Sequence, residues 1–353
     1  MLTVVATQTL EYSLNAARVR IQVSAEELEE ARQRRNAIAV ALGAEFAGSR
    51  IYVNGSIAHG DALTPLTDVD LGVVVPDPDN KYGPGLKGPD DLKQRAANAI
   101  RSGLKDKYGD LAVEVEGRKR SILIRFRDPV AKGLPDFTAD VIVAVDNPDS
   151  LGLYIPRHDT WDRSHPELHT ELIRDANESS GIAYARVVRL VKHWNRTHDK
   201  PLCSWNIKAL ALTSVAEPTT MIAGIRAWLE HAVDQLSKGE TPDPARVALH
   251  PIRTNKPRTE VVRSLRKALE SIDLAVSLER DGYPTLALDE LAKLFKDEEM
   301  LPRPNQRLVL EEEARRVAAN KAEDSKAYGA PALVTGTGAA TNRSRINVRS
   351  WRP

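Results

Sequence analysis

Apolar residues along the chain follow two different periods, and the two periods occupy different regions. Alternation or a short continuous apolar run is typical of strands, whereas a period of 3.6 residues is typical of helices. The first pattern predicts strands at 71–75, 111–115, 122–126 and 137–145. The second predicts a long helix that begins at a capping box formed by Ser24 and Glu27 and ends at Gly43. Another helix is predicted from Asp90.

Beyond Gly181 only the helical period remains. Apolar stripes at spacings of three and four residues predict helices at 182–194, 221–236, 261–276 and 286–295. The segment 154–169 shows neither period and is predicted to connect the two regions. From about Asp324 the stripes stop and Gly, Ala, Thr, Ser and Arg dominate, which favours a poorly ordered tail.

Strands followed by a run of helices indicate an α+β fold. The predicted organisation is a mixed sheet with helices, including the long N-terminal helix, in residues 1–160. A helical lobe follows in 161–323, and a flexible tail occupies 324–353. A length of 353 residues suits two domains or one bilobal unit.

Composition excludes several classes of protein. A formal net charge of +1 argues against strong binding of long nucleic acids, and a single cysteine excludes an intrachain disulfide and suits a reducing cytoplasm. There is no apolar run of about 18 residues, so we expect no membrane span. The N-terminus lacks the pattern of a signal peptide, and the scattered histidines have no cysteine partners at zinc-binding spacing.

Candidate chemistry begins at the first predicted strand. Asp68 and Asp70 are two residues apart, so on a strand they lie on one face, where their charges repel unless a cation lies between them. Mg2+ binds such carboxylates together with substrate phosphates. Upstream, Gly55 permits a close backbone approach, and Ser56 offers a hydroxyl and an N–H to a phosphate. The alternative is a turn followed by an ordinary strand with two solvated acids.

This stretch resembles the signature of the polymerase-β-like nucleotidyltransferases, and more closely that of the bacterial cGAS/DncV-like enzymes that make cyclic oligonucleotides. The matching residues are Gly55, Ser56, Gly60, Ala62, Leu63, Asp68, Asp70 and Leu71. Asp61 stands where that family usually has Thr. The resemblance implies a polymerase-β-like palm and a C-terminal helical lobe that completes the nucleotide cleft, with a long N-terminal helix spanning both lobes.

In that family a third metal-binding carboxylate opens a later apolar strand. Asp140, followed by Val141, Ile142 and Val143, fits this position. Asp136 and Asp146 are rivals, although Asp146 lies at the opposite end of the apolar run. A solvated acid at a strand end is the alternative interpretation of Asp140.

A second block, from Arg189 to Trp205, resembles the family's phosphate-binding segment. The resemblance implies that Lys192 and Ser204 hold the triphosphate and that Trp205 stacks on a base, while core packing is an equally good interpretation of Trp205. Lys208 stands where the family often has Glu, which reverses the charge.

The resemblance implies nucleotidyl transfer with two Mg2+ ions, for which Mn2+ can substitute, held by Asp68, Asp70 and Asp140. Ser56, Lys192 and Ser204 would hold the phosphates of ATP, GTP or UTP. The product would be a cyclic di- or trinucleotide that serves antiphage signalling (CBASS) in the bacterial cytoplasm, and an effector would be linked to the enzyme only through that product.

Two other functions remain open at this point. One is a template-independent transferase that acts on RNA 3′ ends or on protein hydroxyls, against which the near-neutral charge and the lack of a recognisable RNA-binding domain weigh. The other is a catalytically silent nucleotide-binding scaffold, against which the three filled acid positions weigh.

Overall fold

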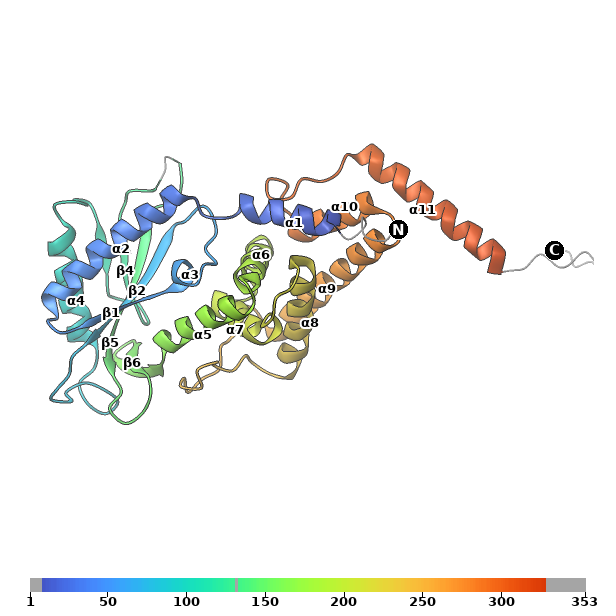
Figure 1. Ribbon diagram of the computed structural model, residues 1–353. Coiled ribbons are helices and arrows are strands. Elements are labelled where there is room, and N and C mark those ends of the chain that lie inside the picture. Colours follow the sequence, from blue (N-terminus) through green and yellow to red (C-terminus); the bar gives the residue numbers. More distant parts are fainter. Residues whose placement is uncertain (1–7, 131–132, 328–353) are drawn as a thin grey trace, which may run out of the picture.

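The computed structural model describes residues 8–130 and 133–327. Figure 1 shows a sheet with its covering helices at one end of the molecule and a bundle of helices at the other. This arrangement confirms the predicted α+β fold. None of the described helices has the length and apolarity needed to cross a bilayer.

The sheet is mixed, with the parallel pair at its centre. Within the described residues it has seven strands, five of them in the order β1-β2-β5-β4-β3, while β6 pairs with β5 and β7 with β6. The strands are β1 (Arg50–Asn54), β2 (Asp68–Val75), β3 (Ala112–Glu114), β4 (Ile122–Arg125), β5 (Thr138–Asp146), β6 (Leu153–Arg157) and β7 (Thr160–Ser164). Strands β2 and β5 are parallel neighbours, and the other pairs are antiparallel.

One face of the sheet is entirely apolar and covered by two helices. Alternate residues of β2 and β5, such as Leu71 and Val141, join a core with α2 (Ala25–Glu45) and α4 (Asp90–Leu104). Because side chains alternate along a strand, the intervening residues face the other side. That second face carries only a small apolar cluster around Tyr52 and Val74, which leaves its remaining positions to polar side chains.

The helices of the second half pack around the buried Trp228 in a separate core. They are α5 (Pro166–Ser179), α6 (Ala183–Thr197), α7 (Ser204–Ser214), α8 (Met221–Lys238), α9 (Arg258–Arg280) and α10 (Pro284–Phe295). Helix α1 (Gln8–Arg20) belongs to the same core through Leu10 and Leu14, although it precedes the sheet in sequence. We call this assembly the helical lobe.

The predicted strands and the main helical stripes are confirmed, but strand β1 was not predicted, and there are four further differences. Helix α2 continues to Glu45, beyond Gly43. The segment 154–169, predicted to be a connection, forms the hairpin β6–β7 and the start of α5. Helix α1 was not predicted. Helix α11 (Gln306–Ala327), which extends away from the helical lobe, was also missed and overlaps the start of the predicted tail, whose remainder lies outside the described residues (Figure 1).

Candidate active site

The sheet places the three predicted acids on one face of adjacent strands. In the parallel pair β2–β5, Asp70 is in register with Asp140, and Asp68 is in register with Thr138. Val69 and Leu71 point into the apolar core, so Asp68 and Asp70 point to the opposite side. The two strands therefore place Asp70 next to Asp140, although the two residues are 70 positions apart in the sequence, as the strand pattern predicted.

A glycine makes room for the second acid. Gly55 begins the short helix α3 (Gly55–Ala58) directly after β1, with φ +81, in the left-handed region that favours glycine. A Cβ on this residue would lie 1.9 Å from Oδ2 of Asp70. The predicted close approach of backbone at Gly55 is therefore an approach to the Asp70 carboxylate itself.

Asp68 and Asp70 are unusual because neither accepts a hydrogen bond nor forms an ion pair with any described residue. Burial, followed by the negative charges of Asp68 and Asp140, raises the pKa of Asp70 to about 7. The pKa of Asp68 is also raised, chiefly because surrounding protein atoms reduce its hydration although part of the side chain meets solvent. Two unpartnered carboxylates with mutual repulsion fit a divalent cation.

Asp140 is close enough to raise the pKa of both acids, but its carboxylate has other partners. Ser121 Oγ donates to its Oδ1 at 2.5 Å, and Arg118 forms an ion pair with the same oxygen at 3.3 Å. Accordingly, no group of three His, Cys, Asp or Glu side chains is placed to share an ion within 8–130 and 133–327. The rival acids are engaged elsewhere: Asp146 pairs with Arg50, and Asp136 accepts from the Asp128 amide.

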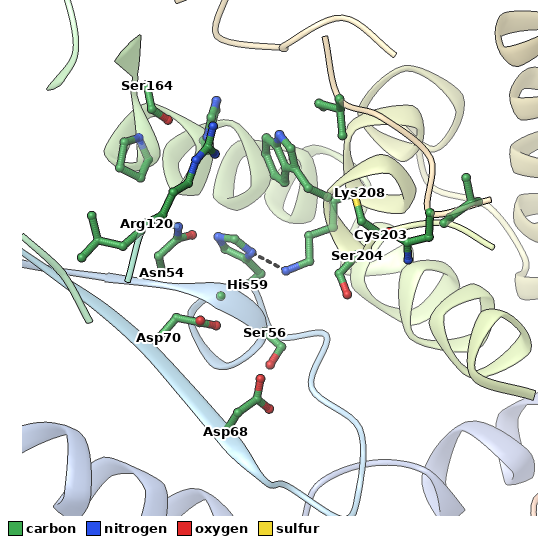
Figure 2. A pocket seen from close by; sticks show the side chains of 18 of the residues that line it. Asn54, Ser56, His59, Asp68, Asp70, Arg120, Ser164, Cys203, Ser204 and Lys208 are labelled. Carbon is green, nitrogen blue, oxygen red and sulfur yellow. Dashed lines mark hydrogen bonds between the residues drawn. The ribbon is translucent and has the colours of Figure 1, made fainter. Parts of the chain in front are cut away.

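The acid pair opens into a cleft of about 1060 Å³ between the sheet and the helical lobe. Figure 2 shows Asp68 and Asp70 on one side of it, and Ser204 and Lys208 on the other. Gly55, Ser56, Lys192 and Trp205 also line it, whereas Asp140 does not. The lysines and arginines of the wall outnumber its four aspartates: Lys119, Arg120, Arg157, Arg163, Lys192, Arg196, Lys200, Lys208 and Arg253. Such a wall suits a polyanionic ligand.

Lys192 and Lys208, on helices α6 and α7, converge on Asp61. Lys192 Nζ lies 2.7 Å from Asp61 Oδ1, and Lys208 Nζ lies 3.2 Å from Asp61 Oδ2. Burial alone would raise the pKa of Asp61, but the two ammonium groups lower it. The two departures from the family pattern, Asp61 and Lys208, are therefore partners of each other, which no local sequence signal indicated.

The remaining predicted contacts lie at the start of α7. Ser204 is exposed at the first turn, with its hydroxyl toward the cleft (Figure 2). The Trp205 ring is half-buried and packs at 4.4 Å, between ring centroids, on His169. One edge of Trp205 therefore contributes to the core, as the packing interpretation expected, while the residue also lines the cleft.

Sequence reasoning missed the far wall of the cleft, which is formed by the segment between α8 and α9. His169 Nε2 lies 2.7 Å from Asp243 Oδ1, and the Val247 and Ala248 amides donate to the other carboxylate oxygen. Burial opposes ionisation of Asp243, but these contacts hold its pKa well below its ordinary value. The segment lacks apolar periodicity, so only its Asp and Pro residues could have suggested an ordered turn.

No family model matches the chain. The chain is 28% identical over 164 residues to a cyclic AMP-AMP-AMP synthase of Escherichia coli (strain MS 115-1), and the match spans 43% of this chain and 44% of that protein. The matched stretch is thus less than half the length of this curated relative.

Solved structures match over most of the chain. E. coli MS115-1 CdnC with ATP superimposes with a TM-score of 0.62 at 15% identity, over 81% of this chain and 98% of that one. The Bradyrhizobium diazoefficiens CD-NTase CdnG with GTP superimposes with a TM-score of 0.61 at 13% identity, and the match covers 82% of this chain and 96% of that one. Vibrio cholerae DncV, a cyclic AMP-GMP synthase, superimposes with a TM-score of 0.54 at 13% identity, and the match covers 86% of this chain and 89% of that one. The resemblance found in the motifs is confirmed by these similarities in sequence and fold.

Proposed function

Starting from a chain with the cGAS/DncV-like fold and matching motifs, we propose that this protein is a nucleotidyltransferase that joins nucleoside triphosphates into a cyclic oligonucleotide. The matched curated relative is named a cyclic AMP-AMP-AMP synthase, and the structural neighbour DncV is a cyclic AMP-GMP synthase. These names support a cyclic product of two or three nucleotides.

The single observation that carries the proposal is the acid pair. Asp68 and Asp70 lie unpartnered on the polar face of β2, at the mouth of a basic cleft, in register with a third acid on β5. An ordinary pair of solvated strand acids would neither need Gly55 against the Asp70 carboxylate nor face such a cleft. Strongly perturbed acids in a cleft are typical of functional sites.

Mg2+, bound by Asp68 and Asp70 and joined by Asp140, would stabilise the charge that develops on the attacking and leaving oxygens. Ser121 and Arg118 both contact Oδ1 of Asp140, whereas no hydrogen bond or ion pair within the described residues occupies Oδ2. That second oxygen would be available to the cation.

The chain's own residues would bind and orient the substrate. Ser56 from α3, and Lys192 and Ser204 from the helical lobe, approach the cleft from both sides and would hold the phosphates so that pyrophosphate leaves in line with the attacking hydroxyl. The accessible part of Trp205 would contact a base. Asp140 would take the proton of the attacking hydroxyl.

The biological setting is proposed by analogy. The neighbour CdnC has been solved in complex with a HORMA protein. We propose that this chain likewise acts in bacterial antiphage signalling, in the cytoplasm, and influences an effector only through its cyclic product. A HORMA-type protein is a candidate activator of this chain.

The test is incubation of the purified chain with all four nucleoside triphosphates and Mg2+ or Mn2+, followed by mass spectrometry of phosphatase-treated products. A small phosphatase-resistant oligonucleotide is expected, and it is expected to vanish in Asp70→Asn. Labelled RNA and the protein itself are included as acceptors. Label on either of these without any cyclic product would replace the proposal with end or protein modification.

A further inference from the structure

We propose that Lys208 is a phosphate-binding residue of the cleft and that Asp61 is the positioning residue that holds it, together with Lys192, in place. The inference deepens the proposed function, since it names a contact of the same nucleotide site. Neither residue follows from the motif: both depart from the pattern that the chain otherwise resembles.

The network is almost completely buried. Asp61 is 0% exposed and Lys208 is 4% exposed. Lys192 donates to the Asp61 carboxylate at 2.7 Å and to its backbone carbonyl at 3.0 Å, and Lys208 donates to His59 Nδ1 at 2.7 Å. Burial of lysine without a carboxylate would cost several kcal/mol. Burial lowers the pKa of Lys208, and the negative charge of Asp61 opposes that lowering, so Asp61 favours the charged form of this ammonium group.

Each ammonium group has at least one N–H left for a ligand. A lysine ammonium has three donors. Lys192 uses two on the carboxylate and carbonyl of Asp61. Lys208 uses one on His59, and its contact with Asp61 Oδ2 at 3.2 Å is an ion pair without hydrogen-bond geometry. Among the described residues no other acceptor is present for the remaining donors of either lysine. Both lysines line the cleft, so the remaining N–H groups are available to a phosphate there.

The direction of Lys208 is fixed by a chain of hydrogen bonds. Burial, then the charge of Lys208, lowers the pKa of His59 to about 3, so its imidazole is neutral. Because Nδ1 accepts from Lys208, the proton lies on Nε2, which donates to Thr170 Oγ1 at 3.2 Å. Thr170 in turn lies 3.5 Å from the Val53 carbonyl oxygen of β1. Helix α7 is thereby joined to the sheet, with the ammonium between them (Figure 2).

The position of Lys208 matches a triphosphate rather than a base. Lys208 lies four residues after Ser204 on α7, so both side chains project from one face of the helix. Its charge also acts on Asp70, which places it within reach of the acid pair. Two ammonium groups share one carboxylate here, which leaves one positive charge in excess. A phosphate bound between Ser204 and the acids would neutralise that charge.

The first experiment compares the affinity of wild type and Lys208→Met for an unreactive ATP analogue with a methylene between the α and β phosphates, in Mg2+, and for adenosine. Loss of one charge-assisted hydrogen bond of about 1.5–3 kcal/mol predicts roughly 10- to 100-fold weaker binding of the analogue, with adenosine unchanged. Lys238→Met, on an exposed pair with Asp234, is the matched control and is expected to change neither affinity.

The second experiment tests the positioning role. Asp61→Asn is expected to lower the melting temperature by several degrees, because two buried ammonium groups lose their shared carboxylate. Adding Lys208→Met to it is expected to recover much of the melting temperature while affinity for the analogue stays as low as in Lys208→Met alone. In Asp61→Asn alone, affinity for the analogue is expected to fall while affinity for adenosine stays unchanged, whereas a merely structural Asp61 would leave both affinities as in wild type.

Equal loss of affinity for the analogue and for adenosine in Lys208→Met would overturn the inference, and so would unchanged affinity for both. The binding results do not depend on whether the chain is a synthase, because binding is measured without turnover. A wild type that forms cyclic product beside an unaffected Lys208→Met would refute only the role of Lys208. Phosphate-dependent binding that needs Lys208, without any cyclic product, would refute only the synthase proposal.

Discussion

Asp61 and Asp70 lie nine residues apart in the sequence, but Asp61 is enclosed behind two lysines of the cleft wall, whereas Asp70 lines the cleft itself. Asp61 is 0% exposed, yet two lysines lower its pKa. Asp70 is only half-buried, yet its pKa is raised to about 7, because burial and two neighbouring carboxylates outweigh the more distant charges of Lys208 and Lys192. Burial alone therefore does not decide the state of a carboxylate.

This difference means that Asp61 stabilises the structure, whereas Asp70 is available to a ligand. The charge of Asp61 is satisfied within the chain, so removing it should harm stability first. The charge of Asp70 is unsatisfied within the described residues, so removing it should harm function while relieving repulsion. The following predictions test this contrast, beginning with the largest expected change in free energy.

Asp61→Asn should lower the free energy of unfolding by about 3–5 kcal/mol, the usual cost of breaking a buried ion pair. Denaturant unfolding at pH 7.5 measures it. Asp146→Asn, which breaks an exposed pair with Arg50, is the control and should cost about 0–1 kcal/mol. Equal effects of the two substitutions would contradict the structural role assigned to Asp61.

Asp70→Asn should reduce product formation by at least about 10²–10³-fold, as expected when a group that stabilises transition-state charge is lost. The same variant should be no less stable than wild type at pH 8 without metal. Asp136→Asn, which removes a rival acid outside the cleft, should retain activity. Full activity of Asp70→Asn would remove the basis of the enzymatic proposal.

Gly55→Ala should lower activity by up to about 10²-fold, because its Cβ would lie 1.9 Å from Asp70 Oδ2 and displace the carboxylate. Initial rates of product formation are the readout. Gly282→Ala is a matched control: its φ of +85 is close to the +81 of Gly55, but nothing lies within 4 Å of the added Cβ. If both variants lose activity equally, backbone strain rather than contact with Asp70 is responsible.

The smallest expected effect concerns pH. A folded pKa of about 7 for Asp70, against about 3.9 in the unfolded chain, means that the folded state binds more protons between these values. The metal-free protein should therefore lose stability as pH rises from about 4 to 7 and change little above that range. In a chain of this length, each 1 kcal/mol of the change would shift the melting temperature by no more than about 2–4 °C. Asp70→Asn should flatten this dependence, and a rise in stability over the same range would be inconsistent with an uncompensated carboxylate.

Much of the site followed from the sequence because strand geometry is local. The spacing of Asp68 and Asp70 fixes their common face, and the apolar runs behind them and behind Asp140 predict two buried strands. Parallel pairing then brings Asp70 and Asp140 into register. The Gly-Ser motif likewise predicted a close approach, though not that Asp70 would be the group approached.

The contacts that could not be predicted join distant parts of the chain. Lys192 contacts Asp61 over a separation of 131 residues in the sequence, and Arg118 contacts Asp140 over a separation of 22 residues. No periodic pattern in the sequence indicates either contact. The hairpin β6–β7 was missed because its residues alternate weakly in polarity. Helix α1 was missed although Leu10 and Leu14 have helical spacing, since their partners lie in the helical lobe far along the chain.

The connection between β1 and β2 belongs to the sheet in sequence but is attached to the helices in space. Besides the lysine contacts, Arg189 donates to the Gly60 and Ala62 carbonyls, and Arg196 donates to that of Thr64. If the sheet and the helical lobe rotate against each other, this stretch moves with the helices and acts as the hinge. The α8–α9 segment, which lines the cleft without belonging to this connection, would then change its distance from the acid pair when nucleotides enter or product leaves.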